Sequence, residues 1–137
     1  YLIMRPTNGV TATLRARDSQ QVLVGALVNA RATARYIREC NPETVVLVAS
    51  HPTGDEDVAC AEYLRGLLGG EGISLEQARD RTRNAFAAKK FLDGRHPRLR
   101  PQDIDMAASD GGEDALVMGV TFDPVPRIDV VRGQGGG

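Results

Sequence analysis

Residues 44–68 read TVVLVASHPTGDEDVACAEYLRGLL, and this stretch decides the fold prediction for the 137-residue chain. Its first part, Thr44–Ser50, is continuously apolar and rich in β-branched residues, which is typical of a strand covered on both faces. A polar loop follows, and apolar residues then recur at helical spacing from Glu56 to about Leu68. Thr53 and Glu56 match a T-x-x-E capping box that would begin this helix. A buried strand followed by an amphipathic helix indicates an α/β protein.

Strands and helices are predicted to alternate on both sides of this stretch. Further strands are predicted at Tyr1–Met4, Gln21–Leu27, Leu116–Phe122 and Ile128–Val131. Further helices are predicted from Asn29 to about Cys40, from a capping box at Ser74 and Gln77 to about Leu92, and over Asp103–Ser109. We therefore predict one layered α/β/α domain over residues 1–132, with a mostly parallel or mixed sheet, as part of a larger fold. Residues 133–137, GQGGG, are predicted to be a flexible tail.

Composition and charge exclude several classes of protein. The chain has 17 basic and 18 acidic residues, and its net charge of −1 argues against an overall basic nucleic-acid-binding protein. No apolar run approaches the roughly 20 residues of a membrane-spanning helix. From the charge and the lack of such a run, respectively, we expect neither a nucleic-acid nor a membrane partner. The sequence contains neither a Walker phosphate-binding loop nor a G-x-G-x-x-G dinucleotide motif. Its two cysteines do not form the disulfide framework of a small secreted domain, and a cytoplasmic location is expected.

Two turns that follow predicted strands carry groups suited to an anion. In an α/β sheet the ligand crevice lies at the carboxyl ends of the strands. Thr7, Asn8 and Gly9 offer side-chain donors and a close backbone approach, although Asn-Gly is also common in plain turns. Asn29 begins a predicted helix, and Arg31 adds a fixed positive charge there. This second arrangement suits a phosphate, although the stretch alone favours a helix cap beside a surface arginine.

The third turn places Glu56 and Asp57 at the start of a predicted helix. Mg²⁺ in proteins takes one or two carboxylates, keeps several waters and bridges to a substrate phosphate. Acidic residues in a first helical turn also compensate the helix dipole, and successive helical side chains diverge by ~100°. The pair is therefore a candidate metal site and, alternatively, ordinary helix capping.

Three segments resemble the 2-phosphosulfolactate phosphatase family in their order and approximate spacing. They are PTNGVTATLRA at residues 6–16, VLVGALVNARATARYI at residues 22–37, and VVLVASHPTGDEDVACAEYL at residues 45–64. The family shows a T-x-NG segment after a strand, a G-[SA]-x-x-NA-x-A segment, and a strand whose Gly-containing loop leads to Glu-Asp at a helix start. The resemblance covers about residues 1–68, and Asp105 and FDPVPRID near the end agree more loosely.

The resemblance implies a magnesium-dependent phosphatase with an α/β fold. Its reaction would be hydrolysis of (R)-2-phospho-3-sulfolactate to 3-sulfolactate and phosphate. Matched by position, Glu56 and Asp57 correspond to the Glu-Asp pair of the family and would be catalytic residues that hold Mg²⁺. The residues expected to bind the small-molecule phosphate ester are Thr7, Asn8, Gly9, Asn29 and Arg31.

Family members are longer and carry an upstream segment resembling D-V-x-R-A-[TS]-[TS], which this sequence lacks. That segment would supply an Asp, an Arg and hydroxyls for metal and phosphate. The chain thus resembles the C-terminal portion of such a protein, and alone it is not expected to complete the site. Two other functions fit the same residues. One is a non-catalytic α/β module that binds a phosphorylated or sulfonated small acid, and the other is a half-sheet that pairs with an N-terminal domain or with a second copy of the chain.

Overall fold

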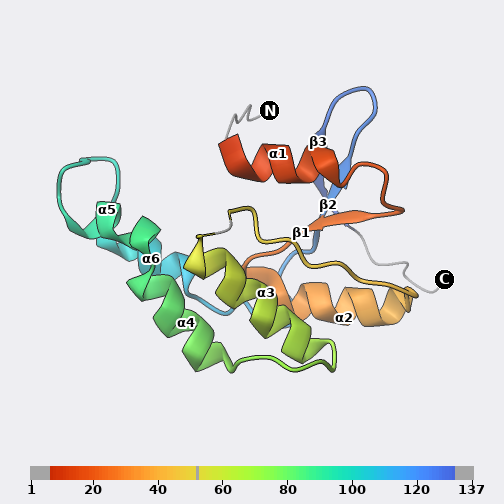
Figure 1. The fold of residues 1–137 in the computed structure, drawn as a ribbon, viewed down its shortest axis with the longest axis horizontal. Coiled ribbons are helices and arrows are strands. Elements are labelled where there is room, and N and C mark those ends of the chain that lie inside the picture. Colours follow the sequence, from red (N-terminus) through yellow and green to blue (C-terminus); the bar gives the residue numbers. More distant parts are fainter. Residues whose placement is uncertain (1–6, 52, 132–137) are drawn as a thin grey trace.

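Strands and helices alternate at the start of the chain, and helices dominate its middle (Figure 1). The computed structural model describes residues 7–51 and 53–131. Its strands are β1 (Val22–Val24), β2 (Met118–Thr121) and β3 (Arg127–Val130). Its helices are α1 (Thr7–Arg15), the 3₁₀ helix η1 (Leu27–Asn29), α2 (Ala30–Cys40), α3 (Asp55–Leu67), α4 (Leu75–Asn84), the 3₁₀ helix η2 (Phe86–Ala88), α5 (Lys89–Leu92) and α6 (Pro101–Ala107). This combination confirms the predicted α/β class.

The sheet has the strand order β1-β2-β3, and both of its pairings are antiparallel. Val22 lies opposite Val120 in the first pairing, and Met118 lies opposite Val130 in the second. A short connection joins β2 to β3, and strands connected in this way pair antiparallel. β1 then adds to the other side of β2. The prediction of a mostly parallel or mixed sheet is therefore wrong for the sheet that the structure describes.

Thr44–Ser50, predicted to be a buried strand, belongs to no strand or helix. Val46 and Val48 are 76% and 62% exposed. No backbone hydrogen bond joins Thr44–Ala49 to any other residue in the described ranges 7–51 and 53–131. This prediction is wrong because an apolar, β-branched pattern forms a strand only where a neighbouring strand is present to pair with it.

Small side chains form the centre of the helical part. The buried cluster joins α2, α3 and α4 and consists of Leu27, Ala30, Ala34, Ala59, Tyr63, Leu64 and Ala78. Alanine projects a single methyl group, which lets neighbouring helices approach closely. Among the described residues, no large side chain is less than 2% exposed. The helices are therefore held by close contact of small groups and not by a thick apolar core.

The predicted turn at Thr7, Asn8 and Gly9 is wrong, because these residues form the first turn of α1. Thr13 Oγ1 donates a hydrogen bond to Gly9 O at 2.7 Å, one turn further along this helix. The strand predicted at Tyr1–Met4 and the tail predicted at 133–137 lie outside the described residues.

The long helix predicted to reach Leu92 ends at Asn84. Ala85 is extended, with φ −60° and ψ 150°, and two short helical elements follow it. This part of the chain has no continuous apolar face to bury, as the 83% exposure of Phe86 shows. None of the helices in the described part of the chain has the length and apolar character needed to cross a bilayer.

One of the two predicted capping boxes is confirmed. Ser74 Oγ accepts a hydrogen bond from Gln77 N at 3.1 Å, and Gln77 Oε1 accepts one from Ser74 N at 2.8 Å. The box predicted for Thr53 and Glu56 is wrong, because α3 begins at Asp55 with Gly54 as its N-cap. Thr53 Oγ1 instead lies 2.8 Å from His51 Nδ1.

Replacing Ser74 with alanine should lower the free energy of unfolding by about 1 kcal/mol, because Gln77 N loses its acceptor. Thr53→Ala is the matched control and should change it by less than about 0.5 kcal/mol. Urea unfolding followed by circular dichroism measures both variants. Equal losses in the two variants would contradict the assignment of the cap.

Candidate functional site

The first turn of α3 presents three acidic side chains in different environments. Asp57 is half-buried, and its Oδ2 accepts a hydrogen bond from Ser50 Oγ at 2.5 Å. Glu56 is also half-buried, and it has no hydrogen bond or ion pair with any residue that the structure describes. Asp55 is exposed and bonds to α4. The two predicted catalytic acids are thus neighbours, and only one of them is held by another side chain.

Arg81 of α4 balances the charge of Asp55. Its Nε lies 3.0 Å from Asp55 Oδ1, and its Nη1 donates a hydrogen bond to Glu62. The hydrogen bond from Arg81 lowers the pKa of Asp55, and the same bond raises the pKa of Arg81. Because both groups are partly exposed, solvent weakens their attraction. Asp55 therefore connects α3 to α4 and differs in role from Glu56 and Asp57.

Cys60 lies one helical turn after Asp57. Burial and, to a smaller extent, the negative charge of Asp57 raise the pKa of its thiol to about 11. A thiol with this pKa stays protonated near neutral pH, and the thiolate is the nucleophilic form. Burial and the charge of Asp57 therefore disfavour the thiolate form of Cys60.

Asn29 is buried, with 7% exposure, and its side chain makes three hydrogen bonds. Oδ1 accepts one from Ala26 N at 2.8 Å, while Nδ2 donates to Val24 O at 3.1 Å and to Leu116 O at 3.3 Å. These bonds connect the end of β1, the start of α2 and the segment before β2. Because both amide hydrogens and the carbonyl oxygen have partners, the geometry favours a structural role for Asn29.

Arg31, predicted to bind an anion, is paired with two carboxylates of the chain. Its Nη1 lies 3.3 Å from Asp110 Oδ2, and its Nη2 lies 3.7 Å from Glu113 Oε1. The hydrogen bond to Asp110 raises the pKa of Arg31. Asp110 Oδ1 also accepts a hydrogen bond from Gly112 N at 2.9 Å. The loop that carries Asp110 thus lies over the start of α2, and a substrate anion would compete with it for Arg31.

Thr7, Asn8 and Gly9 lie on α1, which Figure 1 shows beside the sheet and apart from α3 and α4. The side chain of Asn8 is exposed. No hydrogen bond in the described part of the chain joins Asn8 or Gly9 to Asn29 or to the first turn of α3. Among the described residues, no hydrogen bond or ion pair links the predicted anion-binding residues to Glu56 and Asp57, which are neighbours in the first turn of α3.

Glu56 and Asp57 carry carboxylate oxygens, the type of donor that a hard cation takes. The described residues contain no group of three or more His, Cys, Asp or Glu side chains that could hold a metal ion. Two carboxylates are nevertheless sufficient for Mg²⁺, which takes most of its ligands from water and phosphate. Glu56 has no partner within the described ranges, and Asp57 engages one carboxylate oxygen with Ser50. Oxygen atoms of both side chains thus have no partner among the described residues.

Three residues of these clusters are not identified by any sequence motif. Ser50 lies seven residues before its partner Asp57, whereas Arg81 is 26 residues from Asp55 and Asp110 is 79 residues from Arg31. The position of Ser50, directly after an apolar segment, is the one signal that the sequence offers. The other two pairs form only when the helices pack.

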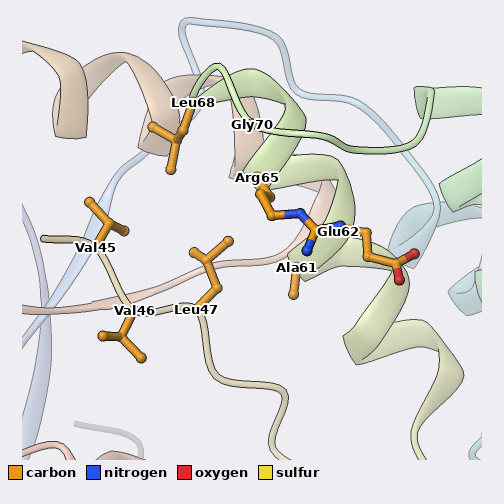
Figure 2. A pocket seen from close by; sticks show the side chains of 8 residues that line it. All are labelled: Val45, Val46, Leu47, Ala61, Glu62, Arg65, Leu68 and Gly70. Carbon is orange, nitrogen blue, oxygen red and sulfur yellow. The ribbon is translucent and has the colours of Figure 1, made fainter.

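An open groove of about 570 Å³ lies elsewhere on the molecule, between Val45–Leu47 and the outer side of α3 (Figure 2). Ala61, Arg65 and Leu68 line its α3 side. None of the predicted site residues lines it. The groove is therefore separate from the candidate catalytic acids.

Comparison with known proteins connects these residues to one family. The family model for 2-phosphosulpholactate phosphatase matches residues 1–100. A probable 2-phosphosulfolactate phosphatase from Bacillus subtilis is 37% identical over 134 residues, which are 95% of this chain and 58% of that relative. Proteins of the same description from Synechocystis sp. and Gloeobacter violaceus are 34% and 43% identical, over 58% and 50% of this chain and 34% and 30% of their own lengths. No solved structure matches the chain significantly.

Asn29→Ala should lower the free energy of unfolding by about 1–3 kcal/mol, because three backbone groups lose the partner that the buried amide of Asn29 provides. Asn8→Ala is the matched control, and its exposed side chain predicts a change below about 0.5 kcal/mol. Chemical denaturation of both variants tests the structural role of Asn29. An Asn29→Ala protein as stable as the parent would refute that role.

Proposed function

Because the chain belongs to the 2-phosphosulfolactate phosphatase family, we propose that it forms part of a phosphoric monoester hydrolase. The proposed substrate is a phosphate ester of a small anionic hydroxy acid, namely 2-phosphosulfolactate, which yields 3-sulfolactate and phosphate. The observation that carries the proposal is the family match over residues 1–100, which includes Glu56 and Asp57 at the start of α3. We take residues 1–132 as one α/β domain of a larger cytoplasmic protein.

Glu56 and Asp57 are the proposed catalytic and metal-binding residues. Phosphate-ester hydrolysis requires neutralisation of charge on the phosphoryl oxygens and a positioned nucleophile. Mg²⁺ bound to these carboxylates would supply that positive charge. Ser50 restrains Asp57 through its 2.5 Å hydrogen bond, and the unpaired N–H groups at the start of a helix favour a nearby phosphate.

The other predicted residues are assigned two kinds of role. Thr7, Asn8 and Gly9 are proposed to bind the phosphate ester, and the exposed amide of Asn8 is available for this contact. Asn29 and Arg31 are proposed to affect the substrate site indirectly. They fix the start of α2 through Leu116 and Asp110, respectively.

The remainder of the site is proposed to come from sequence outside these residues. The chain spans 58% of the length of the Bacillus subtilis relative. A segment resembling D-V-x-R-A-[TS]-[TS] would add an acid, an arginine and hydroxyls to the two carboxylates of α3. The added segment would also provide a surface beside α1, so that Thr7, Asn8 and Gly9 could contact the phosphate ester.

The test uses a chimera in which this chain replaces the matching 134 residues of the Bacillus subtilis relative. Release of inorganic phosphate from 2-phosphosulfolactate is measured with Mg²⁺. Glu56→Gln and Asp57→Asn should each lower kcat by about 100-fold or more, because each removes charge that acts on the phosphoryl group. Asp55→Asn is the matched control from the same helical turn, and kcat should stay within about 3-fold of the parent.

Turnover near the parent level in Glu56→Gln and Asp57→Asn would contradict the site assignment. A chimera that binds 2-phosphosulfolactate by titration calorimetry with and without Mg²⁺, but releases no phosphate, would instead identify the alternative. That alternative is a non-catalytic α/β module for a phosphorylated or sulfonated small acid.

A further inference from the structure

The backbone of Thr44–Ala49 is unpaired within the part of the chain that the structure describes. Within the described residues, no backbone hydrogen bond joins Thr44–Ala49 to another segment, although its composition is that of a buried strand. Unpaired N–H and C=O groups along an apolar segment offer a template for a further strand. The segment thus has the backbone and the side chains of a strand but lacks a neighbour.

The side chains of this segment alternate between two faces. Leu47 packs against the buried cluster of α2, α3 and α4, whereas Val46 and Val48 are exposed. Figure 2 shows Val45 and Leu47 directed to one side of the chain trace and Val46 directed to the other. Alternation with a period of two is the geometry of a strand, and here one of its two apolar faces is uncovered.

The groove beside this segment does not have the features of a small-molecule site. Ligand sites combine an apolar lining with free polar groups that converge on the ligand. The two charged groups of this groove are already bonded within the protein: Glu62 to Arg81, and Arg65 to the carbonyl oxygen of Glu71. What the groove leaves free is apolar surface next to an unpaired backbone, which suits a polypeptide strand.

A strand from the same fold suits this surface better than a second copy of the chain. A strand of seven residues is about 23 Å long, and pairing along its edge covers an area of a few hundred Å² at most. A stable dimer buries about 800 Å² per partner. A strand connected through the same polypeptide needs no such area, because its effective concentration is high. More than a third of the Bacillus subtilis relative lies outside its match to this chain, so the family has residues that would supply the strand.

We propose that Thr44–Ser50, which is not a strand in the described chain, becomes a strand of a second sheet when an apolar β-strand from the part of the family fold outside these 137 residues pairs with it. The incoming strand pairs with the free backbone of Thr44–Ala49. Apolar side chains of the same added region cover Val46 and Val48. The thin core of the described residues is consistent with this arrangement, because large apolar side chains remain at the surface for the added part to bury.

Amide hydrogen exchange compares this chain alone with the chimera defined above. In the chain alone, the amides of Val45–Ala49 should exchange within about 10-fold of an unstructured peptide. In the chimera the same amides should exchange at least roughly 100-fold more slowly. Exchange at equal rates in both proteins overturns the proposal. Slow exchange in the chain alone that fades on dilution also overturns it, since it would identify a second copy as the occupant.

Variants of the exposed face provide a second measurement, and its first part uses the chain alone. In the chain alone, Val46→Asp should shift the Tm by less than about 2 °C, as should the control Val125→Asp at another exposed valine. A Tm lowered by several degrees for Val46→Asp alone would overturn the proposal, because the face would then be covered within this chain. In the chimera, Val46→Asp should abolish the slow exchange of Val45–Ala49, and Val125→Asp should retain it.

Discussion

The close packing of α2, α3 and α4 through alanine side chains is the constraint on which the rest of the structure depends. Ala30, Ala59 and Ala78 are fully buried, one on each helix. Buried methyl groups at these positions fix the separation and rotation of the helices. Asp57 precedes Ala59 by two residues, and Arg31 follows Ala30 directly. The packing therefore determines the direction in which Glu56 and Asp57 project from α3. It also determines which carboxylates Arg31 can reach.

The family motifs differ in what they do in this chain, and some of their residues hold the structure together. Asn29 of the NA motif holds three segments together through one buried amide. Gly111 lies so close to this junction that a Cβ there would be 2.4 Å from Val28 O. The Glu-Asp motif at the start of α3 leaves carboxylate oxygens without a partner among the residues that the structure describes. We therefore propose that phosphatase chemistry takes place at Glu56 and Asp57, and that Asn29 holds the neighbouring segments in position.

Local patterns in the sequence predict the elements that local interactions stabilise. The helix over Ala30–Cys40, the cap at Ser74 and the approximate positions of β2 and β3 follow from periodicity, capping and turn residues. Pairing does not follow in this way, because it depends on which segments meet in space. Thr44–Ser50 has the composition of a strand and no partner, whereas β1 pairs with a strand almost a hundred residues away.

The same distinction explains the candidate site. Glu56 and Asp57 are adjacent in the sequence, so their proximity and their place at a helix start are predictable. Arg31 is predicted as a free cation because Asp110, its partner, lies 79 residues further along the chain. The bond between Ser50 and Asp57 is likewise set by how the chain enters α3 and not by any spacing rule. Residue types thus indicate the chemistry, and packing decides which groups remain free to perform it.

The alanine packing at the centre of the fold is tested most directly at Ala59. Ala59→Leu adds three carbon atoms at a fully buried helix contact and should lower the free energy of unfolding by about 1–3 kcal/mol. Ala61→Leu, on the groove side of the same helix, should change it by less than about 0.5 kcal/mol. Equilibrium unfolding in urea measures both variants. An Ala59→Leu protein at least as stable as the parent would contradict the account, because it would show that the helices do not meet through this methyl group.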